Sequence, residues 1–148
     1  MRIDRTQIFH ACVLGAALCA ALPLAARADE PVVVVETVQA TTYVNGGIGE
    51  GDQARMRRIA AEFPLRMTFS ARKDGEFVAD VPVEIVDMQG MPAFELSRAG
   101  PMLFVSLPDG RYRVLARFKG LTESQQVTVG GNAGKDVLFH WADAAAKK

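Results

Sequence analysis

His140 is the one histidine outside the first 28 residues and so the one candidate base for nucleophilic or acid–base chemistry. A histidine can activate a neighbouring nucleophile because its pKa lies near neutrality. Its neighbours Leu138 and Trp141 are apolar, and it lies near the end of a strand-like stretch. We therefore expect a packed histidine with one hydrogen bond, and a protein that is not an enzyme.

Carboxylates offer a second chemistry, because glycoside hydrolysis uses a pair of them. Those of this chain fall at expected turns or at solvent-facing strand positions, and no pair is singled out by spacing. A cell-wall hydrolase is therefore the least favoured function. The carboxylates considered are Asp74, Glu76, Asp80, Glu84, Asp87 and Asp109.

Two methionines give a metal-binding alternative. Met88 and Met91 flank an expected turn as Met-x-x-Met, and thioethers bind Cu(I). Methionine more often fills irregular apolar gaps. A small-ligand or Cu(I) carrier using Met88, Met91 and His140 therefore stays an alternative, and we expect no cofactor.

Gly46 and Gly47 precede an expected helix, which is where phosphates bind in nucleotide folds. No lysine follows in the P-loop position, and Glu50 and Asp52 would repel an anion there. We expect the two glycines to set the backbone shape. They and the helix form one candidate partner-binding surface.

A row of arginines forms the other candidate surface. Arg111, Arg113 and Arg117 share strand parity, beside a strand whose polar face holds Thr122, Ser124, Gln126 and Thr128. A basic stripe on an exposed sheet face suits an acidic partner protein or envelope polymer. The stripe is also what an ordinary solvated sheet face looks like.

Residues 1–28 have the pattern of a cleavable export signal. Arg2 and Arg5 precede an uncharged apolar run of 14 residues, and Ala26-Arg27-Ala28 supplies the small-x-small cleavage pattern. Cleavage after Ala28 predicts a periplasmic protein. The run is shorter than the roughly 20 residues that span a bilayer, so we expect no membrane insertion after cleavage.

Loss of this segment changes the composition of the chain. It removes both cysteines, Cys12 and Cys19, and leaves 120 residues, enough for one domain. It also leaves 14 basic and 16 acidic residues, a net charge near −2. Nothing in this charge predicts a nucleic acid or an anionic membrane as partner.

One helix is expected, over about 51–63. Met56, Ile59, Ala60 and Phe63 recur at helical spacing, and Pro64 ends the pattern. The residues before it, 29–49, are interpreted as an extended lead-in, either unpaired or pairing as an edge strand, that ends in a flexible turn. The helix would thus precede the first core strand.

From Leu65 onward the hydrophobic period is mostly two, which predicts strands. Residues 102–107 are apolar at nearly every position, as expected of a strand covered on both faces. Pro82 cannot donate a ladder hydrogen bond, so its strand is expected to be an edge or to begin with a bulge. Residues 142–148 are expected to be a disordered tail. The seven expected strands span about 65–70, 81–85, 94–96, 102–107, 112–118, 121–129 and 136–141.

These strands, joined by turns rich in glycine, proline and aspartate, predict a mainly β antiparallel sandwich with a domain over 50–141. The stretches 80–87, 100–104, 107–114 and 139–141 together resemble a carboxypeptidase regulatory-like domain. With Tyr43-Val44-Asn45-Gly46-Gly47 and the helix, the chain is similar to a group of uncharacterised exported proteobacterial proteins that carry this domain. The resemblance implies a seven-stranded transthyretin-like, or Ig-like, sandwich without catalytic residues. The predicted function is that of a non-enzymatic envelope protein that binds another protein or a polymer, in an oligomeric state that the sequence leaves open.

Overall fold

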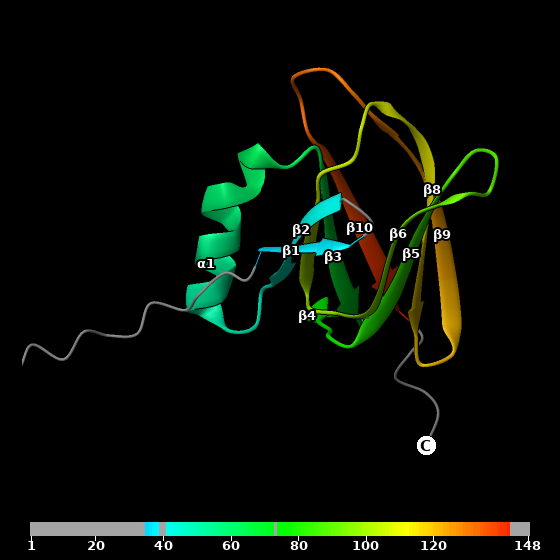
Figure 1. The fold of residues 1–148 in the computed structure, drawn as a ribbon. Helices are drawn as coiled ribbons and strands as arrows, with labels where there is room; N and C mark the ends of the chain where they lie inside the picture. Colours follow the sequence, from blue (N-terminus) through cyan, green and yellow to red (C-terminus); the bar gives the residue numbers. More distant parts are fainter. Residues whose placement is uncertain (1–34, 39–40, 73, 143–148) are drawn as a thin grey trace, which may run out of the picture. The chain divides into compact units, whose positions relative to one another are not determined.

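The computed structural model describes residues 35–38, 41–72 and 74–142, with backbone alone for the first of these ranges. All of them belong to one compact unit, Pro31–Lys148. The expected export signal, both cysteines and residues 143–148 of the expected tail lie outside the described residues. Within that described part, the chain forms ten strands and one short helix (Figure 1).

Sheet A contains six of these strands. All its pairs are antiparallel except β3 with β10, which run parallel. β4 pairs with the last two residues of β3. In hydrogen-bonded order the strands are β1 (Val35–Val38), β2 (Thr41–Gly46), β7 (Met102–Val105), β3 (Leu65–Ala71) and β10 (Lys135–Trp141), with β4 (Glu76–Phe77) beside β3.

Sheet B is a four-stranded antiparallel sheet. Lys119 and Gly120 form the two-residue turn between its last two strands, with φ of 47° and 81°. Both angles are positive, as the favoured two-residue hairpin turn requires. The strand order is β6 (Pro92–Ala99), β5 (Val81–Asp87), β8 (Gly110–Phe118) and β9 (Leu121–Val129).

The main core lies between the two sheets. Side chains of both sheets enter one buried cluster, mostly from alternate positions along a strand, with Phe69 and Phe139 from sheet A and Ile85 and Val114 from sheet B among them. Phe69 and Phe139 stack with ring centroids 5.6 Å apart. The period of two read from the sequence therefore marks the buried face correctly on both sheets.

The helix covers the other face of sheet A (Figure 1). α1 spans Glu50–Ile59 and continues as a 3₁₀ turn, Ala60–Glu62, which confirms the helix expected over 51–63. Met56 and Phe63 pack in a second buried cluster with Val44, Met102 and Phe104. Every residue of β7 is therefore buried, as its unbroken apolar run predicted. No helix in the described ranges is long and apolar enough to cross a bilayer.

Strand β4 was not predicted, and β1 and β2 lie in the expected lead-in, for which one edge strand was the alternative; β1 is at the edge of sheet A, but β2 is an inner strand. β2 is no lead-in, because it pairs with both β1 and β7, and Tyr43 and Val44 are buried. The helix therefore follows a core strand instead of preceding all of them. β2 shows no polar alternation because Tyr43 faces the main core while Val44 faces the helix.

Pro82 lies at a bulge and not at a sheet edge. The pairing of β5 with β6 shifts register between Val81 and Val83, and the pairing with β8 starts at Val83. The missing N–H of the proline thus falls where the ladder is already interrupted. Of the two alternatives predicted for the strand of Pro82, an edge or a bulge, the bulge is confirmed.

Candidate functional site

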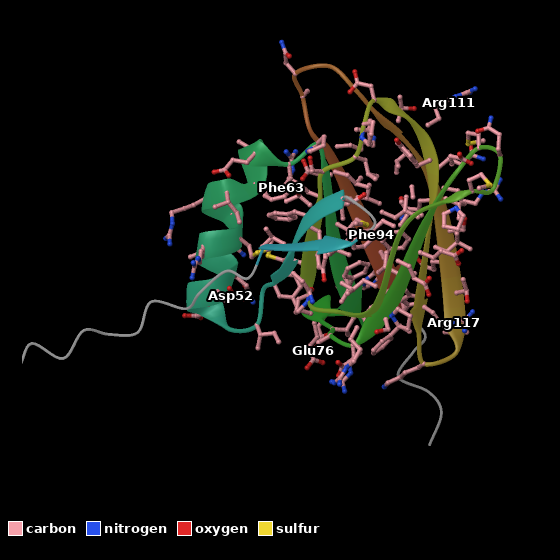
Figure 2. All side chains as sticks on the ribbon, in the orientation of Figure 1. Asp52, Phe63, Glu76, Phe94, Arg111 and Arg117 are labelled. Carbon is pink, nitrogen blue, oxygen red and sulfur yellow. The ribbon has the colours of Figure 1, made fainter. Side chains whose placement is uncertain are left out.

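Strand β8 places three arginines on the outer face of sheet B. Its alternate residues Tyr112, Val114 and Ala116 are buried in the core, so the intervening side chains must face outward. The arginines at 111, 113 and 117 are all exposed. Figure 2 shows Arg111 and Arg117 near opposite ends of the sheet. The shared parity read from the sequence is thus a shared face, which we call the arginine row (Arg111, Arg113, Arg117).

The neighbouring strand β9 supplies a polar border to this row. Thr128, Gln126 and Thr122 lie directly opposite Arg111, Arg113 and Arg117, and all three border residues are exposed. Nε of Arg117 donates a hydrogen bond to Oγ1 of Thr122 at 3.2 Å. The border therefore offers hydroxyl and amide groups to anything that reaches the guanidinium groups.

Among the residues that the structure describes, no carboxylate forms an ion pair with the arginine row. The ion pairs found in the described ranges use Arg66, Arg72 and Arg98 instead. Within those ranges Arg111 and Arg113 make neither an ion pair nor a hydrogen bond. Each guanidinium carries five donors, so this face presents unused donors and uncompensated positive charge.

Tyr112 anchors the start of β8, between the first two arginines. Its hydroxyl donates a hydrogen bond to the carbonyl oxygen of Pro108 at 2.9 Å. Burial, reinforced by the charges of Asp87 and Asp109, raises the pKa of Tyr112. The hydroxyl therefore remains a donor at neutral pH and fixes the turn that precedes Arg111.

Two glutamates lie side by side on the other side of β8, and the sequence did not predict that they are neighbours. Glu84 of β5 and Glu95 of β6 are directly opposite one another and both exposed. They line a shallow concavity of about 230 Å³, together with Leu115 and Arg117. The sequence places Glu84 on a solvent-facing strand position, but the register that brings Glu95 beside it has no local signal.

No protein-family model matches the chain, and no curated protein sequence matches it. The candidate site is therefore described by its own geometry.

Gly46 and Gly47 lie at the α1 side of sheet A, apart from the arginine row. Gly47 is buried with φ of 91°, and a Cβ there would come within 2.8 Å of Cγ of Met102. The backbone N–H groups of Gly47 and Ile48 donate to Oδ2 of Asp52 at 2.5 and 3.1 Å. Asp52 thus occupies the place that a bound phosphate would take, and the glycines set the backbone shape.

The structure does not bring the candidate metal ligands together. Met88 and Met91 are 39% and 63% exposed on the turn after β5. That turn lies at the end of sheet B where Asp87 pairs with Tyr112 and Gly110 pairs with Val129, next to the loop that leads into β10. β10 begins at that end of the molecule with Lys135. His140 lies five residues farther along the strand, about 17 Å from Lys135, and therefore at the opposite end from the two methionines. No group of three or more His, Cys, Asp or Glu in the described ranges could hold a metal ion.

His140 makes a contact that the sequence did not specify. Its Nδ1 lies 2.9 Å from the hydroxyl of Ser70, its partner in the parallel pairing of β10 with β3. Ser70 is only 4% exposed, and its hydroxyl is also 3.4 Å from the carbonyl oxygen of Phe139. The pair therefore ties two strands together through a hydroxyl that a substrate does not reach.

Proposed function

We propose that the protein is a non-enzymatic accessory protein of the cell envelope that binds an acidic protein or polymer on the outer face of sheet B. The proposal includes export to the periplasm after cleavage at Ala28, and a transthyretin-like sandwich of the carboxypeptidase regulatory-like kind as the scaffold. The observation that carries the proposal is the unpaired arginine row. Exposed arginines gain from an anionic partner because little desolvation opposes the new contacts.

Binding of an acidic partner at this face should depend on the salt concentration. Contacts between exposed charges weaken as ionic strength rises, because the screening length falls to about 8 Å at physiological salt. We expect binding of an acidic probe to weaken between low and physiological salt. The net charge near −2 that cleavage at Ala28 would leave opposes such binding, so the effect must arise locally on sheet B.

The test uses the mature chain, residues 29–148, and two charge-reversed variants. Arg111→Glu with Arg113→Glu alters the arginine row, whereas Arg57→Glu with Arg58→Glu makes the same charge change on exposed positions of α1. Binding is measured with poly-L-glutamate at low salt and with partners cross-linked in the native envelope. We expect loss of about tenfold or more in affinity for the first variant alone, since each exposed charge contact contributes up to about 1 kcal/mol.

Retained binding by the Arg111/Arg113 variant would contradict the proposal. Loss in the Arg57/Arg58 variant alone would move the binding surface to the helix and the glycine loop.

A further inference from the structure

Glu84 and Glu95 place two negative charges on the outer face of sheet B, beside the arginine row. Their positions are directly opposite on adjacent antiparallel strands, where like charges destabilise a sheet. Neither forms an ion pair or a hydrogen bond with any residue that the structure describes. This sheet face therefore carries two unneutralised carboxylates beside the unneutralised arginine row.

The concavity at this point has the size of one side chain. Its volume of about 230 Å³ is below the roughly 300 to 1,000 Å³ of pockets for whole small ligands. Leu115 and Leu96 give it an apolar surface, and the two glutamates outnumber the one cationic residue of its lining, Arg117, so its charge is negative. A long aliphatic stem ending in an ammonium group matches both features. The complementary group is therefore the side chain of a lysine.

The spacing of the arginines along β8 determines where acidic residues must lie relative to that lysine in a bound peptide. Arg111 and Arg113 are two residues apart, about 7 Å along β8, while Arg113 and Arg117 are about 14 Å apart with Leu115 midway. An extended peptide repeats its side chains at the same interval. A peptide lying along β8 would place acidic side chains over the three arginines and its remaining inward side chain over Leu115.

We infer that the concavity is a lysine subsite, and that the acidic partner is an extended peptide segment with acidic residues on alternate positions and a lysine among them. This inference rests on the proposed binding of an acidic partner by sheet B. A uniform polyanion places one more negative charge beside Glu84 and Glu95. In the mixed peptide, the acidic residues lie over the arginine row and the lysine lies between Glu84 and Glu95.

The test compares two synthetic seven-residue peptides that differ at one position. Both carry glutamate at positions 1, 3 and 7 and glycine at the even positions; position 5 is lysine in one peptide and acetyl-lysine in the other. Acetylation keeps the stem and makes the peptide more negative. Simple attraction to the arginines therefore predicts tighter binding of the acetylated peptide. The lysine subsite predicts the reverse, by roughly threefold or more, the value of an exposed ion pair.

Variants assign the preference to the two carboxylates. Glu84→Gln with Glu95→Gln should abolish the preference for lysine, while the exposed Glu62→Gln at the end of the helix should retain it. Backbone amide NMR spectra report the fold of each variant, and shifts at Leu115 locate the peptide. Affinities come from calorimetry at low salt.

Each outcome bears on one of the two proposals. If neither peptide, poly-L-glutamate nor alginate binds, the proposed function fails. If both peptides bind through the arginines but acetyl-lysine is equal or better, the lysine subsite alone is overturned. If an acidic polysaccharide such as alginate binds through the arginines and neither peptide does, the partner is a polymer and the inference is also overturned.

Discussion

Asp52 illustrates at the scale of one residue why the loop before the helix is not a phosphate site. Its carboxylate lies at the positive end of α1 and accepts hydrogen bonds from the N–H groups of Gly47 and Ile48. The approach is close, because a Cβ on Gly46 would come within 2.8 Å of the same carboxylate oxygen. The prediction that these glycines set the backbone shape is thus confirmed by contacts that no sequence motif records.

We predict that Gly47→Ala destabilises the fold more than the same change at two nearby glycines. Gly47 combines φ of 91° with the close approach of Met102, whereas Gly49 has φ of 79° with open space around it. Gly49 has ψ of 161°, a conformation that almost only glycine adopts, so Gly49→Ala should cost about 1 to 3 kcal/mol from backbone strain alone. Gly47→Ala should cost about 1 kcal/mol more, because the added methyl group also meets Met102. Gly51→Ala, in the helix and without neighbours within 4 Å, should be neutral or stabilising.

Urea unfolding of the three variants measures these differences. Equal losses at Gly47 and Gly49 would show that the contact with Met102 is unimportant.

Arg66 joins three elements of the structure. Its Nε and Nη2 donate to the two carboxylate oxygens of Asp136, each at 2.7 Å, and its Nη1 donates to the carbonyl oxygens of Ala60 and Phe63. The side chain thus links β3, the end of the helix and β10. Gly134 leaves room for this arrangement, since a Cβ there would overlap the guanidinium.

We predict that Asp136→Asn costs about 1 kcal/mol at neutral pH, a value kept low because the Asp136 side chain is 78% exposed. The hydrogen bond from Arg66 holds the pKa of Asp136 below its usual range. A carboxyl group whose pKa is lower in the folded state stabilises the fold above its unfolded pKa of about 4, and this stabilisation is lost as pH falls through the folded value. The difference between wild type and variant should therefore be full at pH 6 and shrink below pH 4.

Chemical denaturation from pH 2.5 to 7 follows that difference. A constant difference at all pH values would mean that the pair with Arg66 does not form in solution. Arg66→Lys should destabilise similarly, because lysine cannot hold both carboxylate oxygens and the helix carbonyls at once.

The sequence predicts most elements and little of their pairing. Period-two patterns and, for β7, an unbroken apolar run located seven strands, and helical spacing located α1, because each pattern records which faces are buried. β2 was missed because Tyr43 and Val44 are buried on opposite faces. The parallel pairing of β10 with β3 joins residues 70 positions apart, and nothing local to either strand encodes it.

In the candidate site too, features along one strand could be predicted from the sequence, whereas contacts between strands could not. The parity of Arg111, Arg113 and Arg117 could be read along one strand, and the structure confirms their shared exposed face. The opposition of Glu84 and Glu95 depends on a register that includes the bulge at Pro82, so it could not be read from either strand alone.

At the scale of the whole described unit, sheet A separates two clusters of buried side chains. The main core fills the side toward sheet B, and the smaller cluster around Met56 lies under the helix. The candidate binding face is the outer surface of sheet B, so the main core lies between it and the smaller cluster. Damage under the helix should therefore leave the arginine row in place.

We predict that Met56→Ala lowers the free energy of unfolding by about 2 to 5 kcal/mol, because Met56 is fully buried and alanine leaves a cavity. Met56→Leu, which nearly conserves volume, should cost less than about 1.5 kcal/mol. Hydrogen exchange should quicken first in α1, while β5 and β8 keep their protection under native conditions. Since β8 carries the arginine row and β5 carries Glu84, affinity for poly-L-glutamate should equal that of wild type. Weakened binding by a Met56→Ala protein whose β8 amides remain protected would show that the helix takes part in binding, and the partner would then have to contact both faces of the molecule.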